Sequence, residues 1–209
     1  MSSSPAPSPA SSSTANRQGA RTRALIRAAA SALALTRTPG QFTVKHVAEA
    51  AGVFPNQITH HFGSKDRLYL EAAFALLLRD SGRLTRVARG ARSPEEFGRA
   101  LARTALALPS LPSLTSALAL ARGHEELGQL ASGYLKVLFA RSERFLERRL
   151  QREGWAAGHG VARASKTFWV AVFGAVLAHE AGFAGGPTDL DIASGLALTR
   201  GSGSATMGS

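Results

Sequence analysis

Apolar residues recur at three- and four-residue intervals along most of the 209-residue chain, and no convincing stretch alternates with the two-residue period of a strand. This pattern predicts an all-α fold. Helices are expected over residues 17–37, 43–51, 55–61, 64–89, 93–109, 111–121, 124–153, 162–183 and 188–199.

Prolines and glycines mark the predicted helix ends. Pro39 and Gly40 stop the first helix, since proline cannot continue it and glycine supplies the turn. Gly52 turns the chain between two short helices, and Pro55 stands at the first position of the next, where a missing N–H costs nothing. The run Ser93-Pro94-Glu95-Glu96 combines a cap, a proline and an acid in the pattern of a helix start, which indicates a domain boundary there.

The chain ends differ in composition from the rest. Residues 1–16 are almost wholly Ser, Pro and Ala, and residues 200–209 are rich in Gly and Ser, so both are expected to be disordered or flexible tails. The start of the chain lacks the apolar core of a secretory signal, and the longest apolar run, 168–178, is too short to span a membrane. The absence of cysteine excludes disulfides and thiolate chemistry. These features predict a soluble intracellular protein.

Positive charge is concentrated in the first part of the chain. The whole sequence has 25 Lys and Arg against 14 Asp and Glu, a net charge of +11. Residues 17–92 contain 13 of the bases and 4 of the acids, net +9, which leaves 12 bases and 10 acids, net +2, for residues 93–209. Such a distribution favours a polyanionic partner, either nucleic acid or an anionic membrane surface, although arginine used only for solubility gives the same balance.

The segment from Thr43 to Leu68 reads TVKHVAEAAGVFPNQITHHFGSKDRL. It predicts two short helices joined by a turn at Gly52, with the small Ala48 where the helices cross, which is the spacing of a helix-turn-helix. The segment also resembles the DNA-binding domain of the TetR family of bacterial repressors, through TVxxVAxxAGV and the ending HHFGSKDRL. This resemblance extends from about Arg23 to Ala72.

The resemblance implies a helix-turn-helix domain over residues 17–62 and a helical ligand-binding and dimerisation domain over 63–199, with 63–90 as the connecting helix. It implies a repressor that binds a palindromic operator in double-stranded DNA as a homodimer and is released by a small molecule. Two positions depart from the family pattern. Phe54 replaces the usual capping Ser or Thr, and Thr59 replaces a phosphate-contacting Tyr.

Roles carried over by position divide the predicted DNA contacts into two groups. Base contacts are expected from Lys45, Pro55, Asn56 and Gln57, since Asn and Gln pair well with adenine and Lys with guanine. Backbone contacts are expected from Thr43, Thr59, His60, His61 and Lys65. Arg17, Arg21 and Arg23 are further candidates for DNA contact, although they equally fit a solvated helix face.

In the remainder of the chain, bulky residues on inward helix stripes are candidates for lining an effector cavity, which favours an apolar or aromatic effector. They are Phe74, Leu78, Phe97, Leu106, Leu118, Tyr134, Leu138, Trp169 and Phe173. A stripe of small residues in the most apolar helix permits close approach of a partner helix and is the predicted dimer contact. It consists of Ala171, Ala175, Ala178 and Gly182.

No nucleophile motif, phosphate-binding loop or pair of catalytic carboxylates occurs, so no enzyme activity and no cofactor are expected. His60 and His61 lack further ligands at a suitable spacing, and no metal site is expected. The expected location is the cytoplasm, in association with the nucleoid. Two other classes stay open: a sequence-indifferent architectural DNA-binding protein, and a basic membrane-surface protein that uses Arg79, Arg83, Arg86 and Arg89.

Overall fold

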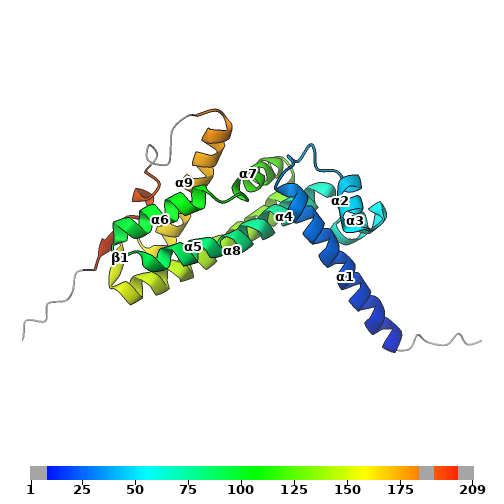
Figure 1. Ribbon diagram of the computed structural model, residues 1–209, viewed down its shortest axis with the longest axis horizontal. Helices are drawn as coiled ribbons and strands as arrows, with labels where there is room; N and C mark the ends of the chain where they lie inside the picture. The colour runs from blue at the N-terminus through cyan, green and yellow to red at the C-terminus, as the bar shows by residue number, and fades with distance from the viewer. Residues whose placement is uncertain (1–8, 184–190, 202–209) are drawn as a thin grey trace, which may run out of the picture.

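The computed structural model describes residues 9–183 and 191–201 and confirms the all-α class (Figure 1). Its elements, in chain order, are α1 (Pro9–Ala34), α2 (Val44–Ala51), α3 (Pro55–Phe62), α4 (Lys65–Asp80), α5 (Gly82–Val87), the 3-10 turn η1 (Ala88–Gly90), α6 (Pro94–Leu106), α7 (Leu111–Leu120), α8 (Glu125–Glu153), β1 (Trp155–Ala157), α9 (Val161–Glu180), the 3-10 turn η2 (Ser194–Leu196) and β2 (Leu198–Arg200).

Helices α2 and α3 and the C-terminal part of α1 form a head at one end of an elongated molecule, and the N-terminal part of α1 projects beyond it (Figure 1). Helix α1 packs on α2 and α4, and α3 packs on α2 and α4. The side chains between them are fully buried, with Ile26, Phe42, Val47 and Ile58 each at most 1% exposed. Burial of each such side chain contributes about 1.5–3 kcal/mol to the stability of the head. The two short helices are therefore held in a fixed relation.

The other end of the molecule is a helical domain built around the long helices α8 and α9, which pack on each other. Helix α4 joins the two parts, because it contacts α1 and α3 in the head and α7 and α8 in the helical domain. Helix α4 has buried residues on more than one side, among them Phe74 and Leu77, which are fully buried. A rotation of α4 therefore cannot leave either domain unaffected.

The first helix and the connecting helix differ from the sequence-based prediction. Helix α1 begins at Pro9, inside the segment expected to be a disordered tail, and ends at Ala34, three residues early. The helix predicted over 64–89 is interrupted: α4 ends at Asp80, and α5 starts at Gly82. The Ser81 hydroxyl donates to the Leu78 carbonyl oxygen at 2.8 Å, so a side chain competes for the backbone acceptor at this break.

The end of the chain also differs. The prediction of a helix over 188–199 is wrong for the described residues of that range, which form η2 and then β2. Thr188 and the rest of 184–190 lie outside the described residues. Strand β2 pairs antiparallel with β1, with Trp155 opposite Arg200. Ala197 has a φ of 44°, in the left-handed region, which is incompatible with a continuing α-helix. Gly158 N–H donates to the Ala197 carbonyl oxygen at 2.9 Å, so the irregular backbone still has a partner.

Among the described helices, α9 is long and apolar enough to cross a bilayer by length and composition alone. Core helices of soluble proteins meet the same criterion. One side of α9 is buried within this chain: Phe168, Trp169 and Val172 are at most 4% exposed, and the helix contacts α6, α7 and α8. Its apolar character is thus explained on that side by packing.

Candidate nucleic-acid interface

The α2–turn–α3 unit has the geometry that its sequence requires. Gly52 has a φ of 65°, the left-handed conformation that glycine adopts without strain. The turn is closed by the Val53 N–H, which donates to the Ala48 carbonyl oxygen at 3.1 Å. Ala48 is only 3% exposed, and a larger side chain there would separate the helices. The predicted helix-turn-helix is thereby confirmed in its local structure.

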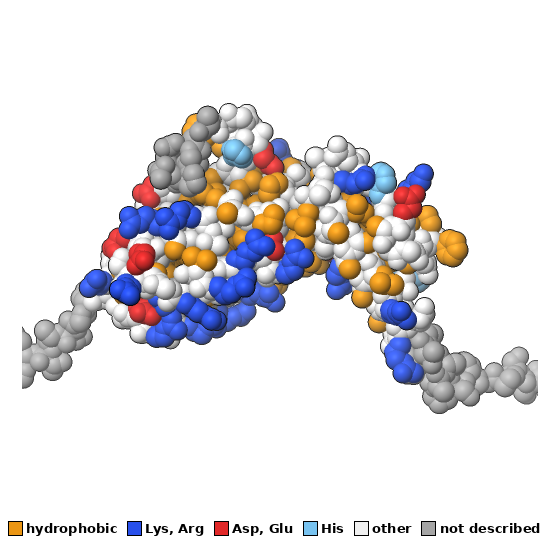
Figure 2. Space-filling view, in the orientation of Figure 1, with side chains coloured by type: hydrophobic (Ala, Val, Ile, Leu, Met, Phe, Trp, Pro, Cys, Tyr) orange, Lys and Arg blue, Asp and Glu red, His pale blue; other side chains and the backbone are white. Residues whose placement is uncertain are grey.

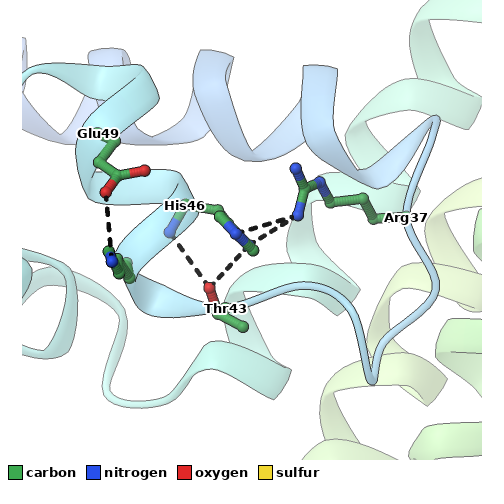
Figure 3. Close-up of polar contacts among 5 residues, drawn as sticks. Arg37, Thr43, His46 and Glu49 are labelled. Carbon is green, nitrogen blue, oxygen red and sulfur yellow. Dashed lines mark hydrogen bonds and ion pairs between the residues drawn. The ribbon is translucent and has the colours of Figure 1, made fainter.

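Thr43 caps α2 and belongs to a small polar cluster with His46 and Arg37 (Figure 3). Its hydroxyl oxygen accepts from the His46 N–H at 3.2 Å. Arg37 Nη1 lies 2.8 Å from His46 Nδ1, and because a guanidinium only donates, this ring nitrogen is an acceptor. The Thr43 hydroxyl, 2.9 Å from the same nitrogen, must then donate to it. The Thr43 hydroxyl therefore already uses its proton inside the domain and has none to donate to a phosphate oxygen.

Five of the predicted DNA contacts project to solvent. Four lie on α3, whose inner side holds the buried Ile58 and Phe62: Pro55, Asn56, Thr59 and His60. The fifth is Lys45 on α2, whose side chain is 81% exposed and lies 4.0 Å from Glu49. Such a surface ion pair is worth at most about 1 kcal/mol, so a phosphate or base can replace it readily. Together, these exposed residues of α2 and α3 form the candidate DNA-binding surface.

The other predicted contacts on α3 and α4 are half-buried and have internal partners. Gln57 Oε1 accepts from the Phe54 N–H at 3.2 Å and so caps its own helix. A Cβ on Gly19 of α1 would lie 4.0 Å from His61 Cε1, which places this ring against α1. Lys65 pairs with Asp66, and its ammonium lies 3.5 Å from the Pro39 carbonyl oxygen. Any DNA contact from these residues competes with a structural role.

Phe54 was not among the predicted contacts, yet its side chain is 76% exposed, more than that of any other large hydrophobic residue described. It immediately precedes α3 and makes no side-chain cap. The sequence carried the signal, because an aromatic residue stands where a small capping hydroxyl is usual. Its exposure places an apolar group beside Pro55 and Asn56.

The basic residues of α1 have mixed roles. Arg21 is exposed, whereas the Arg23 guanidinium lies 4.9 Å from the Phe62 ring centre and 3.9 Å from a carboxylate oxygen of Glu71. Glu71 is only 7% exposed and is also 3.2 Å from Arg67 Nε. Arg23 therefore helps to join α1, α3 and α4. Arg17 lies exposed nearer to the start of the same helix.

A cavity of about 380 Å³ lies in the helical domain between α4, α5, α6, α8 and α9. Three predicted lining residues, Leu78, Leu138 and Trp169, border it. The full lining is Leu78, Ser81, Gly82, Leu84, Thr85, Leu101, Leu138, Arg141, Ser142, Arg144, Phe145, Leu146, Arg148, Ser165, Phe168, Trp169 and Leu196. Its volume falls within the range of small-molecule sites.

The remaining predicted lining residues lie in the core rather than on this cavity. Phe74 stacks on Tyr134 with ring centres 4.9 Å apart, and burial raises the pKa of the Tyr134 phenol above its usual value. Phe97 packs on Phe145 and Trp155. Leu106, Leu118 and Phe173 are half-buried against the same core. Aromatic character on an inward stripe does not distinguish a filled core from a hollow one, so a role of these residues in ligand binding stays a prediction.

Two family models match the chain. One, described as bacterial regulatory proteins of the tetR family, matches residues 26–72, and the other, described as a bacterial transcriptional repressor C-terminal domain, matches residues 94–197. A solved structure of a transcriptional regulator from Rhodococcus sp. RHA1 is 33% identical, with a TM-score of 0.70 over 82% of this chain and 91% of that chain. The chain belongs to the TetR family of bacterial transcriptional regulators.

More distant solved structures share the fold of this TetR-family regulator. The fatty acid degradation regulator FadR from Bacillus halodurans is 16% identical, with a TM-score of 0.56 over 84% of this chain and 94% of that chain. NalD, the secondary repressor of the MexAB-OprM multidrug efflux pump in Pseudomonas aeruginosa, is 18% identical, with a TM-score of 0.50 over 88% and 98%. No curated protein matches the chain.

The small-residue stripe predicted for dimer contact in this TetR-family regulator does not form one exposed face. Ala175 is 9% exposed and belongs to the core, Ala171 and Ala178 are half-buried, and Gly182 is exposed beyond the end of α9. On the solvent side of α9, which also includes the exposed Lys166, the exposed apolar positions are Val170, Gly174 and Leu177, of which Val170 is 61% and Leu177 50% exposed. These positions, spaced by four and three residues, form one apolar stripe.

Proposed function

We propose that the protein is a transcriptional repressor that binds a palindromic operator as a homodimer and releases it when a small molecule occupies the cavity. The observation that carries the proposal is the exposed polar side of α3, where Asn56, Thr59 and His60 project from a helix fixed in a rigid head. A helix presented in this way fits the major groove, where amide side chains distinguish base pairs.

The proposed dimer forms through α8 and α9, whose solvent sides include the exposed Val137, Val170 and Leu177. Two-fold symmetry would place two copies of α3 in successive major grooves, about 34–36 Å apart. A ligand that binds better to a conformation with a different spacing lowers operator affinity by linkage. The cavity borders the break at Ser81 and Gly82, directly beyond the helix that contacts the head. The working location is the cytoplasm, on the nucleoid.

The proposal is tested by selecting from random duplex DNA with purified protein at about physiological salt, which suppresses nonspecific phosphate binding. An enriched palindrome with two half-sites is the expected result. Binding without enrichment, together with a steep salt dependence, would contradict specific repression and favour an architectural DNA-binding protein.

Asn56 offers the cleaner test of base recognition, because Gln57 also caps α3. With the selected operator, Asn56→Ala is expected to lower affinity about tenfold or more through loss of a base contact. Affinity for scrambled DNA at the same salt should be nearly unchanged. Fluorescence anisotropy on both duplexes measures the two effects. An equal loss on both duplexes would assign Asn56 to the DNA backbone instead.

Phe54 is expected to contact a thymine methyl group, because its ring is 76% exposed beside the proposed base-facing side of α3. Phe54→Ala should lower operator affinity roughly three- to tenfold. Replacing single thymidines of the operator by deoxyuridine removes only the methyl group. At one position this change should weaken binding by the normal protein and leave the Phe54→Ala variant unaffected. Equal sensitivity of both proteins at every position would refute the contact.

A further inference from the structure

The cavity in the helical domain has an uneven chemical character. Its inner wall is apolar and aromatic, formed by Leu101, Leu138, Phe145, Phe168 and Trp169. Its other wall includes three arginines of α8, and no acidic residue is among its lining residues. A site with one apolar side and one cationic side is complementary to a molecule that has an apolar part and an anionic part. The assignment of a ligand class to this cavity rests on the proposed function of the cavity as an effector site.

The three arginines, Arg141, Arg144 and Arg148, occupy successive turns on one side of α8. All three are exposed, and none takes part in an ion pair with another described residue. Of the acids in the same stretch, Glu143 lies about 100° or more around the helix from each of the three arginines, and Glu147 lies about 60° from Arg144, yet neither acid is paired with any of the three in the described structure. Figure 2 shows basic side chains gathered along this edge of the helical domain, over α5 and α8. The positive charge is thus available to a ligand.

Ser165 on α9 is an independent indication that a polar ligand group enters the cavity. The residue borders the cavity and is 1% exposed, and its hydroxyl has no hydrogen-bond partner among the described residues. Buried hydroxyl groups nearly always have a partner, because leaving one unpaired is costly. The nearby Ser142 hydroxyl oxygen accepts from Trp169 Nε1 at 2.6 Å, which leaves its own proton free to be donated. Two residues that line the cavity therefore have hydroxyl protons with no acceptor among the described residues.

We infer that the cavity binds an amphipathic organic anion: an apolar chain or ring system seated against Trp169 and Phe168, with a carboxylate or similar acidic group held by the arginines of α8. The Ser165 hydroxyl donates to an oxygen of this ligand and so gains the partner that it lacks. A neutral apolar compound would leave both the charge and the hydroxyl unused. A cationic compound of the same shape would be repelled by three guanidinium groups.

Three probes with the same chain and different head groups test the inference by isothermal titration calorimetry on purified full-length protein without DNA. They are decanoate, 1-decanol and decyltrimethylammonium, each below its aggregation concentration. Decanoate is expected to bind about 10- to 100-fold more tightly than 1-decanol, and its affinity alone should fall with added salt. Equal binding of decanoate and 1-decanol, preference for the ammonium probe, or no binding at all would overturn the inference.

Matched substitutions locate the charge effect. The triple substitution R141Q/R144Q/R148Q should remove most of the preference for decanoate over 1-decanol. The control R83Q/R86Q/R89Q removes three exposed arginines of α5 and η1 that do not line the cavity, and it should retain the preference. Equal loss in both variants would assign the effect to the general field of the protein and refute the site.

Ser165→Ala separates a ligand contact from a structural role. Because the hydroxyl has no partner in the free protein, its removal should leave the Tm of the free protein unchanged or higher. Decanoate affinity should fall about threefold to tenfold. A lower Tm with unchanged affinity would contradict the assignment. Operator selection is measured separately without any ligand, so failure of the inference leaves the proposed repressor function standing, and the reverse also holds.

Discussion

Replacing both Val170 and Leu177 with glutamate should convert the protein to monomers and lower operator affinity at least about 100-fold. The two side chains are the most exposed large apolar residues of α9, at 61% and 50%. In a symmetric dimer they would meet their counterparts, and four buried carboxylates would oppose association. A monomer binds one half-site without the gain in effective concentration that joining two heads provides, which is worth about 10²–10⁴ in affinity. Sedimentation velocity and operator titration measure the two effects.

Val87→Glu combined with Ala107→Glu is the matched control for this experiment. Both positions are exposed, both lie outside α8 and α9, and the change in net charge is the same. This variant should remain dimeric and bind the operator normally. A dimeric V170E/L177E variant would place the interface elsewhere. Ala175→Glu, the substitution that the sequence alone favours, is not informative, because Ala175 is 9% exposed and a buried charge there destabilises the subunit itself.

Arg149→Ala should lower the free energy of unfolding by about 2–4 kcal/mol, the largest effect expected for a substitution outside the apolar core. The side chain is 5% exposed, and Nη1 lies 2.9 Å from a Glu153 carboxylate oxygen. Nη2 donates to the Ala91 carbonyl oxygen at 2.7 Å, across 58 residues of chain. The guanidinium also lies over the Phe97 and Trp155 rings, at 5.6 and 5.3 Å from their centres. Its removal leaves a cavity and an unpaired carbonyl group. Urea unfolding followed by circular dichroism measures the loss.

Arg152→Ala provides the control. Arg152 Nε lies 3.2 Å from the same Glu153 oxygen, but its side chain is 63% exposed. An exposed ion pair contributes at most about 1 kcal/mol, so this variant should unfold close to the normal urea concentration. Equal destabilisation by the two substitutions would show that the shared carboxylate matters and that burial of Arg149 does not.

The α2–turn–α3 unit of the head was predictable from sequence, since its local signals agree with its packing, whereas α1 begins and ends earlier than predicted. Thr43, Gly52 and Pro55 each determine a cap, a turn or a helix start through their own backbone chemistry, and the structure places all three as expected. The break between α4 and α5 was not predictable in this way. No proline marks it, and although the pair Ser81-Gly82 often forms turns, a single serine or glycine also occurs within helices, so the sequence did not decide between the two.

The functional surfaces were predictable only in part, because exposure depends on tertiary packing. Periodicity placed Trp169 and Leu138 on inward stripes, but it could not show that these two residues border a cavity with Leu78 while Phe74 stacks on Tyr134. The same limit applies to Ala175, which faces the subunit core although its spacing fits a contact between helices. Gln57 was predicted as a base contact from its position, whereas the hydrogen bond that its side chain accepts from the Phe54 N–H depends on a rotamer, which the sequence does not determine.

The pairing of β1 with β2 has a practical consequence for handling the protein. Residues 155–157 and 198–200 act as a clasp that closes a loop of chain containing α9, and Gly201 N–H adds a last bond to the Gly154 carbonyl oxygen at 2.8 Å. Truncating the chain before Leu198 removes the pairing partner of β1 and leaves the C-terminal end of this loop unattached, even though no residue of α9 is removed. An affinity tag or fluorescent reporter is therefore best joined beyond Gly201, where the pairing of β1 with β2 is retained.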